Sequence, residues 1–341
     1  MEWPDRDIAS VRAMLARMHD ADPGELHLDQ RLLRGGLESA SVTRLAVRYR
    51  DPLGKARVHT MVVKRLAGQA AREASVYQRL LSTCPGVAPR LLAAERPAPD
   101  RAVLYLEALR PASRWPWRDV TATRSVLERV ALLHRAEPAR EAVASLSRWD
   151  YETELLASAR RTLEQLERFR RPAPPAVRRG IRWVRRLVEA LPALRRQLLA
   201  FSPLRASVIH GDLHSGNVIL RRRKGRIEPV LLDWGRARIG SPLEDVSSWL
   251  QSLAEWEPET RRRHDTLFAG YLAARGLEAR LSKDLRAAYW LAGASNALAG
   301  ALSYHLWVIA NERTSASKAA GALRSAQEWL RILRRADACW S

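Results

Sequence analysis

Cysteine is scarce in this sequence of 341 residues, and lysine and long apolar runs are scarce as well. The two cysteines, Cys84 and Cys339, lie far apart and show no metal-ligand spacing. This pattern argues against a disulfide framework and favours a reducing compartment. Because no amino-terminal signal peptide is visible either, we expect a cytoplasmic protein.

Lysine is so rare that most of the positive charge comes from arginine. The lysines are Lys55, Lys64, Lys224, Lys283 and Lys318. The formal net charge of +21 is compatible with a nucleic-acid partner, an acidic membrane surface or an anionic substrate. The simpler interpretation is an arginine-rich composition with solvated basic faces. The setting of each lysine is therefore informative.

One uncharged stretch, residues 287–310, is long enough to span a bilayer on length alone. It is poor in large aliphatic side chains and contains Asn296, His305 and two serines. We therefore predict a buried helix and no membrane insertion.

The patterning predicts an α+β chain with two lobes. Helical spacing indicates a helix over residues 7–19, followed by strands over 32–50, 58–66, 88–95 and 102–109 and a helix over 69–81. Helices dominate after residue 110: we expect them over 115–134, 152–171, 176–199, 244–254, 259–274, 282–310 and 315–336. We expect a β-rich amino-terminal lobe over residues 1–110 and a helical carboxy-terminal lobe over residues 111–341.

Lys64 stands out because it follows apolar residues in a predicted strand. A buried ammonium group is costly unless a carboxylate or phosphate offsets it. The next helix offers Glu73, its only acidic residue, so a Lys64–Glu73 pair would aim the ammonium group at the phosphates of a nucleotide. The alternative is an edge-strand lysine whose head group lies in water.

Two loops could contact the rest of a nucleotide. Gly35, Gly36, Ser39 and Ser41 offer backbone N–H groups and hydroxyls that suit phosphates, although a plain hairpin loop has the same composition. The connector from Glu107 to Leu109, at the end of the last predicted strand, offers backbone groups to an adenine edge.

A polar turn between two apolar strands carries the chemistry. Asp212 and Asn217 lie five residues apart after the first strand, and Asp233 ends the strand of the following hairpin. Phosphoryl transfer needs a carboxylate that orients the attacking hydroxyl and hard oxygen ligands for Mg²⁺. Asp212 suits the first need, and Asn217 with Asp233 suits the second.

These motifs carry a family resemblance. The stretches 210–217 (HGDLHSGN), 232–235 (LDWG) and 240–245 (GSPLED) resemble the aminoglycoside phosphotransferase and choline kinase superfamily, whose fold is protein-kinase-like. The resemblance implies that Asp212 is the catalytic residue. It implies that Asn217 and Asp233 hold Mg²⁺. It also implies that Lys64, fixed by Glu73, contacts the phosphates of ATP, with GTP as the alternative donor.

Two further roles follow from the resemblance. It implies that Asp245 binds backbone N–H groups of the catalytic loop and that His210 supports this loop. The absence of an activation-loop arrangement after Asp233 disfavours a protein kinase. Arg236 and Arg238 follow the metal aspartate, close to where an acceptor would lie.

The acceptor is expected to be a small neutral or anionic hydroxyl compound. The carboxylates after Asp245 are scattered amid a positive excess, which is unfavourable for a polycationic aminoglycoside. The alternatives are an RNA or peptide hydroxyl, bound by the arginine-rich predicted helices, and a catalytically silent nucleotide-binding scaffold. Nucleic acid is not the favoured partner, and the sequence leaves the oligomeric state open.

Overall fold

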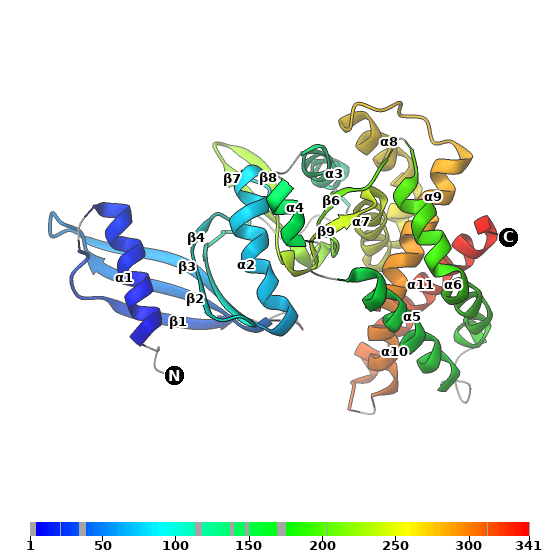
Figure 1. Cartoon of the computed structure of the whole chain (residues 1–341), viewed down its shortest axis with the longest axis horizontal. Coiled ribbons are helices and arrows are strands. Elements are labelled where there is room, and N and C mark those ends of the chain that lie inside the picture. The colour runs from blue at the N-terminus through cyan, green and yellow to red at the C-terminus, as the bar shows by residue number, and fades with distance from the viewer. Residues whose placement is uncertain are drawn as a thin grey trace. The chain divides into compact units, whose positions relative to one another are not determined.

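The computed structural model describes residues 5–20, 22–33, 39–112, 118–136, 140–146, 150–168, 175–202, 204–311 and 313–340. The chain divides into two compact units. The first comprises Met1–Ala112 and Ile219–Arg236, and the second comprises Ser113–Val218 and Ala237–Ser341. The sequence predicts a division near residue 110. The structure differs in that the hairpin after residues 212–217 belongs to the first unit. Figure 1 labels the elements of both units.

The first unit is built on a five-stranded antiparallel sheet with the order β1-β2-β3-β5-β4. The strands are β1 (His27–Leu33), β2 (Ser39–Arg50), β3 (Ala56–Ala67), β4 (Leu91–Ala98) and β5 (Arg101–Glu107). Helix α1 (Asp5–His19) shares one apolar core with the sheet, contributing Val11, Met14 and Leu15. Because β3 lies between β2 and β5 in the sheet, it is an interior strand.

Strand β1 shows why edge strands are hard to predict. The apolar pattern predicts one continuous β region over residues 32–50, whereas β1 ends at Leu33 and β2 begins at Ser39. Most side chains of β1 are exposed, so the strand lacks the apolar alternation that marks β2. Gly35 and Gly36 lie outside the described residues.

A continuous helical segment and a hairpin complete the first unit. The segment runs through η1 (Gly68–Arg72), α2 (Glu73–Ser75), the π-helical η2 (Val76–Leu80) and η3 (Leu81–Thr83), which confirms the helix expected over 69–81. The hairpin consists of β7 (Val218–Arg223) and β8 (Arg226–Leu231), followed by η5 (Trp234–Arg236). The Leu231 N–H donates to the Val87 carbonyl at 2.8 Å, which ties the hairpin to this unit.

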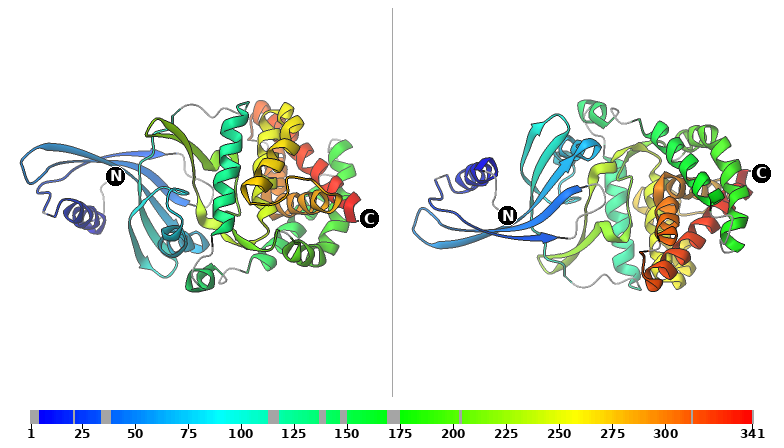
Figure 2. Two further views of the ribbon diagram at one scale, coloured as in Figure 1. Left: turned by 90° about the horizontal axis from the view of Figure 1, so that it is seen from above. Right: turned by 90° about the horizontal axis from the view of Figure 1, so that it is seen from below.

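The second unit is helical, with one two-stranded sheet of β6 and β9. Its elements are α3 (Val120–Arg135), α4 (Arg140–Leu146), α5 (Tyr151–Arg168), α6 (Pro175–Ala200), β6 (Ser207–Ile209), η4 (Ser215–Asn217), β9 (Arg238–Gly240), α7 (Pro242–Trp256), η6 (Pro258–Arg263), α8 (His264–Ala274), α9 (Lys283–Asn296), η7 (Ala297–Ala301), α10 (Leu302–Ala310) and α11 (Ala316–Trp340). Helices α5, α6, α9, α10 and α11 pack around one apolar core, and Figure 2 shows this bundle in two views.

The uncharged stretch over 287–310 is interrupted in the structure. Helix α9 passes into the π-helical η7, where Gly300 has a φ of 141°, and α10 follows. A glycine tolerates this backbone conformation without a steric penalty. Across the part of the chain that is described, no helix is long and apolar enough to cross a membrane.

Candidate active site

Lys64 lies on the interior strand β3 of the first unit, with its side chain only 9% exposed. Its Nζ donates to Glu73 Oε2 at 2.6 Å and to Asp233 Oδ1 at 2.7 Å. The predicted Lys64–Glu73 pair is thus confirmed, and the alternative of a solvated edge-strand lysine is wrong. The direct contact with Asp233 does not follow from the sequence analysis, because Asp233 is distant in the chain.

Burial and charge compete at this pair. Burial raises the pKa of Glu73 above its usual range, and the neighbouring Lys64 offsets only part of that effect. Burial would lower the pKa of Lys64, but Glu73 and Asp233 outweigh it and raise the pKa instead. Lys64 therefore stays an ammonium group at neutral pH. The other oxygen of Glu73, Oε1, accepts the Trp234 N–H at 3.1 Å.

Asp233 lies at the end of the hairpin in an uncommon backbone conformation. Its φ is 62°, a left-handed value that aspartate tolerates better than most residues. The following residue, Trp234, is fully buried and donates its Nε1–H to the Leu231 carbonyl at 3.0 Å. The side chain of Asp233 is 35% exposed, so the buried tryptophan anchors a carboxylate that solvent still reaches.

The other nucleotide candidates of the first unit occupy strand ends. Ser39 and Ser41 open β2 at an irregularity of its pairing with β3, and Ser41 is half-buried. The Glu107 carboxylate accepts Arg221 Nη1 at 2.9 Å, and the Glu107 N–H donates to the Arg90 carbonyl at 2.9 Å. These two groups of Glu107 are therefore engaged within the unit. The backbone of Leu109 makes no hydrogen bond with another described residue.

In the second unit, Asp245 holds the loop that contains Asp212. Its carboxylate accepts the His210 N–H at 2.7 Å and the Gly211 N–H at 2.8 Å. Burial would raise the pKa of Asp245, but the hydrogen bond from His134 and the backbone donors outweigh it and lower the pKa. The predicted role of Asp245 as a backbone anchor is confirmed.

His134 supports Asp245 and was missed by the sequence analysis. Its Nε2 lies 3.1 Å from Asp245 Oδ2, and its Nδ1 lies 2.7 Å from the Tyr271 hydroxyl. Because an ionised carboxylate only accepts hydrogen bonds, Nε2 carries the proton and Nδ1 accepts from Tyr271. Burial lowers the pKa of His134, so the ring is neutral at pH 7. The sequence gives little indication of this role, because a histidine within an apolar helical pattern does not show which residue it contacts.

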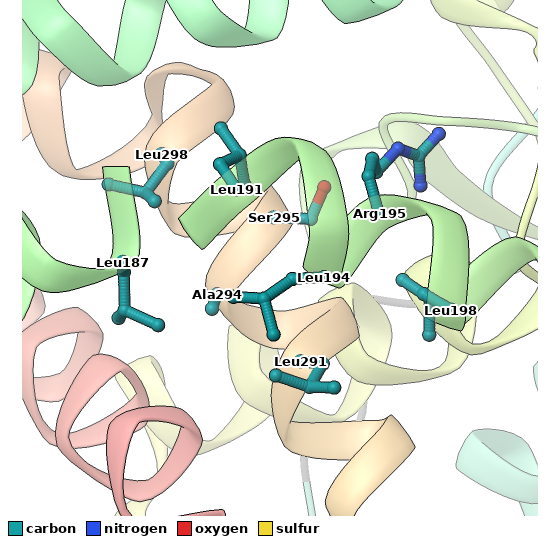
Figure 3. A pocket seen from close by; sticks show the side chains of 9 residues that line it. All are labelled: Leu187, Leu191, Leu194, Arg195, Leu198, Leu291, Ala294, Ser295 and Leu298. Atoms are coloured by element: carbon teal, nitrogen blue, oxygen red, sulfur yellow. The ribbon is translucent and has the colours of Figure 1, made fainter. Parts of the chain in front are cut away.

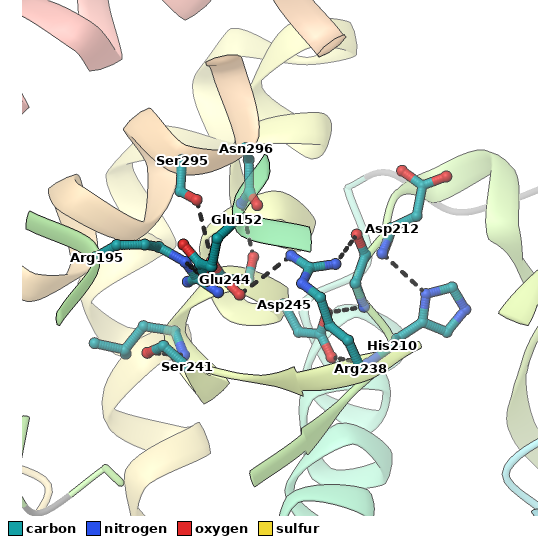
Figure 4. Close-up of polar contacts among 12 residues, drawn as sticks. Glu152, Arg195, His210, Asp212, Arg238, Ser241, Glu244, Asp245, Ser295 and Asn296 are labelled. Carbon is teal, nitrogen blue, oxygen red and sulfur yellow. Dashed lines mark hydrogen bonds and ion pairs between the residues drawn. The ribbon is translucent and has the colours of Figure 1, made fainter. Parts of the chain in front are cut away.

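The Asp212 carboxylate makes no hydrogen bond or ion pair with another described residue, and Figure 4 shows it pointing away from the surrounding polar network. The backbone around it is well held. The Asp212 N–H donates to His210 Nδ1 at 3.3 Å, and Asn217 Nδ2 donates to the Asp212 carbonyl at 2.9 Å. The Asn217 amide therefore turns its nitrogen inward and leaves its oxygen available.

Two histidines of the loop are structural. His210 is fully buried and accepts the Asp212 N–H, which agrees with its predicted supporting role. His214 Nδ1 accepts the Gly216 N–H at 3.0 Å and thereby caps the short helix η4. Both side chains order the backbone between Asp212 and Asn217.

Arg238 is a correction to the sequence analysis, which places it close to an acceptor. Its guanidinium is only 4% exposed, donates to Glu244 Oε2 at 3.2 Å and lies 3.6 Å above the Tyr151 ring. A buried, paired guanidinium of this kind is part of the protein interior. The structure thus brings Lys64, Glu73 and Asp233 together in the first unit, and Asp212 and Asn217 in the second.

The fold is of the kinase-like class that the sequence predicts, as the solved structures show. The chain is similar to an ethanolamine kinase of Plasmodium vivax, with 10% identity over 87% of this chain and 80% of that chain and a TM-score of 0.53. It is similar to a choline/ethanolamine kinase family protein of Mesorhizobium loti, with 18% identity over 96% and 99% and a TM-score of 0.51. An amicoumacin kinase in complex with AMP-PNP and Ca²⁺ gives 16% identity over 89% and 88% and a TM-score of 0.54.

The sequence profile described as "Phosphotransferase enzyme family" matches residues 58–282, which is more than half of the chain. The chain belongs to this family of phosphotransferases. No curated protein gives a significant match. The predicted resemblance is confirmed at the level of the family, while the roles of individual residues stay predictions.

Proposed function

We propose that the protein is an ATP-dependent O-phosphotransferase that moves the γ-phosphoryl group to a hydroxyl of a small molecule. The observation that carries the proposal is the ion pair of Lys64 with Glu73 and Asp233. A buried ammonium group fixed by one fully buried and one part-exposed carboxylate suits contact with nucleotide phosphates. The solved kinases with AMP-PNP, or with ADP and spectinomycin, support the choice of an adenine nucleotide.

The first unit is proposed to bind the nucleotide. Lys64 contacts the α- and β-phosphates, and Glu73 keeps its ammonium group in place. Further hydrogen bonds to phosphate oxygens are proposed to come from Gly35, Gly36, Ser39 and Ser41. GTP is the alternative nucleotide. The free backbone groups of Leu109 suit an adenine edge better than the backbone N–H of Glu107, which already donates to Arg90.

Asn217 and Asp233 are proposed to hold Mg²⁺. The donor set fits, because an amide oxygen and a carboxylate are hard oxygen ligands of the kind Mg²⁺ prefers. The Asn217 amide nitrogen is already bonded to the Asp212 carbonyl, so its oxygen is the atom left for a cation. When bound, Mg²⁺ neutralises charge on the phosphate oxygens.

Asp212 is proposed to act on the acceptor. Its carboxylate accepts the proton of the acceptor hydroxyl while that oxygen bonds to the γ-phosphorus and the bond from the γ-phosphorus to the ADP oxygen breaks. No described residue forms an ion pair with this carboxylate, which supports the role because an ion-paired carboxylate would be a weaker base. The loop that carries it is fixed by Asp245.

The charges of the second unit favour a neutral or anionic acceptor. Three carboxylates that follow Asp245 in the chain already face cationic partners. The pairs are Glu257–Arg118, Glu259–Arg262 and Asp265–Arg286. A polycationic acceptor would compete with these partners, and the net charge of +21 would slow its approach. The two cysteines are free, which supports the proposed cytoplasmic, reducing location.

The test is release of ADP from ATP across a panel of hydroxyl compounds, with and without Mg²⁺. We expect Mg²⁺-dependent turnover that Asp212→Ala lowers by about 100-fold to 10,000-fold, the range for loss of a general base. Asp284→Asn is the matched control, because Asp284 is exposed on α9 and forms no ion pair with a described residue. Equal, negligible rates for the wild type and Asp212→Ala would contradict the proposed function. Efficient, Asp212-dependent turnover of an aminoglycoside would contradict the proposed acceptor class.

A further inference from the structure

The peptide group between Gly211 and Asp212 is held at both of its polar ends. Its carbonyl, which belongs to Gly211, accepts Arg238 Nη1 at 3.1 Å. Its N–H, which belongs to Asp212, donates to His210 Nδ1 at 3.3 Å. Gly211 has a φ of 80°, and a glycine at such a position permits the following peptide plane to turn over. The two hydrogen bonds oppose that rotation.

Rotation of this peptide would redirect the Asp212 side chain. The Asp212 carboxylate has no protein partner of its own among the described residues, so only the backbone fixes its direction. Of the two bonds to the peptide, the one from Arg238 is charge-assisted and the stronger in kind. The orientation of the carboxylate therefore depends on where Arg238 is held.

Arg238 is held by a buried network that runs through Glu244 (Figure 4). Glu244 is fully buried, and its Oε2 accepts Arg238 Nη2 at 3.2 Å. Its Oε1 accepts Arg195 Nη1 and, at 3.1 Å, the Ser295 hydroxyl. Arg195 in turn donates to Glu152 Oε1 at 3.0 Å. Helices α5, α6, α7 and α9 thus all contribute to the position of one guanidinium.

Arg195 lies beside the Tyr151 ring, at 5.1 Å from its centroid, and beside an apolar wall. With Ser295 it borders a narrow crevice whose wall is otherwise apolar, as Figure 3 shows. The wall is formed mainly by Leu187, Leu191, Leu194, Leu198, Leu291 and Leu298. The Arg195 guanidinium is only 3% exposed, so water cannot replace its protein partners. Without Glu244 and Glu152 it would lose these hydrogen bonds, which is costly for a buried charge.

A buried network of charges is a poor way to gain stability, because apolar residues of equal volume often serve as well or better. The contact of Arg238 with the Gly211 carbonyl, next to Asp212, therefore indicates a positioning role. We propose that Arg238, held by Glu244 and Arg195, is a positioning residue that fixes the Gly211–Asp212 peptide and so aims the Asp212 carboxylate at the acceptor. The inference rests on the proposed function of Asp212.

The main variant is Arg238→Met, which keeps much of the side-chain length and removes the hydrogen bonds to Gly211 and Glu244. We expect faster amide hydrogen exchange in a peptide covering residues 208–213. We also expect kcat for hydrolysis of Mg·ATP to ADP and phosphate to fall by about 10-fold to 100-fold, with KM for ATP within about twofold. The split between kcat and KM separates misdirection of Asp212 from general loss of structure.

Arg261→Met is the matched control. Arg261 forms an ion pair with Glu328 in the same unit and does not contact the loop. We expect it to leave both loop exchange and kcat unchanged. If Arg238→Met does not fold, Glu244→Gln replaces it, because glutamine keeps the shape and one acceptor for Arg238. The expected fall in kcat is then about threefold to tenfold, with the same increase in exchange.

Unchanged exchange over residues 208–213 in a folded Arg238 or Glu244 variant would overturn the proposal. So would faster exchange with wild-type kcat, provided that Asp212→Asn lowers kcat in the same assay. If Asp212→Asn has no effect, the proposed function fails, and the exchange measurement still decides whether Arg238 fixes the loop.

Discussion

Each unit of this protein contains a charged cluster centred on one buried side chain, and these two clusters have opposite polarity. In the first unit one cation, Lys64, lies between the carboxylates of Glu73 and Asp233. In the second unit one anion, Glu244, lies between the guanidiniums of Arg195 and Arg238. Both central side chains are buried, and in each cluster one partner comes from a distant part of the chain.

Exposure separates the two clusters. Asp233 is 35% exposed, so the first cluster has one end that a ligand can reach. In the second cluster Arg195, Arg238 and Glu244 are all at most 4% exposed; Arg238 donates to the backbone carbonyl of Gly211, and Arg195 donates to Glu152, whose side chain is 53% exposed. A part-exposed end suits binding of phosphate and metal, whereas a buried cluster suits fixing of the chain. Variants of the two clusters should therefore fail in different ways.

The largest effect is expected for the free energy of unfolding of variants in the cluster of Arg195, Glu244 and Arg238. Arg195→Met leaves the fully buried Glu244 with one cation in place of two. Removing one partner of a buried ion pair costs about 3–5 kcal/mol. Chemical denaturation, monitored with a probe in the second unit, measures the free energy of unfolding of the variant and of the wild type. A loss below about 1 kcal/mol would show that the network is dispensable and would break the comparison.

The next effect concerns pH and is also expected in the second unit. Burial of His264 lowers its pKa to about 4, against about 6.5 in an unfolded chain. Between these values the unfolded state binds a proton that the native state excludes, so native stability falls as pH drops from about 6.5 to about 4. The loss is about 3 kcal/mol and does not grow further below pH 4.

His264→Gln removes this titration and is expected to flatten the stability profile over that pH window. Amide exchange in α8, compared with β3 as an internal reference in the first unit, reports the difference between variant and wild type. Parallel pH profiles of the two proteins would contradict the assignment to His264.

For the cluster of Lys64, Glu73 and Asp233, the expected effect is a loss of activity. Lys64→Met should lower kcat/KM for ATP by about 100-fold, which corresponds to about 2.7 kcal/mol of transition-state stabilisation. Lys64→Arg is the matched control, because it keeps the charge and changes the geometry, and we expect partial activity. Wild-type kcat/KM in Lys64→Met would remove the evidence that this cluster binds phosphates.

The smallest effect is expected at an exposed pair that belongs to neither cluster. Asp265 and Arg286 form an ion pair with side chains that are 64% and 47% exposed. Asp265→Asn should change stability by less than about 1 kcal/mol, and added salt should remove the difference. A change as large as that for Arg195→Met would show that burial does not decide the cost.

Much of the fold could be predicted from the sequence because its signals are local. Amphipathic spacing predicts α1 and most helices of the second unit within a few residues, and apolar alternation predicts β2 and β3. The Lys64–Glu73 pair was predictable for a different reason. A rare lysine in an apolar strand needs a partner, and the next helix offers one acidic residue.

The cluster of Arg195, Glu244 and Arg238 was not predictable, because Arg195 lies far from the other two in the chain and each residue alone is interpreted as a solvated charge. Arg238 follows Asp233 closely in the sequence and was placed near the acceptor for that reason, yet it is buried against Glu244 and Tyr151. His134 was missed in the same way. The spacing of a motif identifies groups that act on a ligand, while groups that act on the backbone carry no comparable sequence pattern.

The most direct test of the account is transfer of a phosphoryl group observed by mass. Wild-type protein and Asp212→Asn are incubated with Mg·ATP and a mixture of neutral and anionic metabolites, and products are identified by mass spectrometry. The account predicts at least one hydroxyl compound that gains a single phosphoryl group with the wild type and does not gain it with Asp212→Asn. The same phosphorylated products, in equal yield, from both proteins would contradict it.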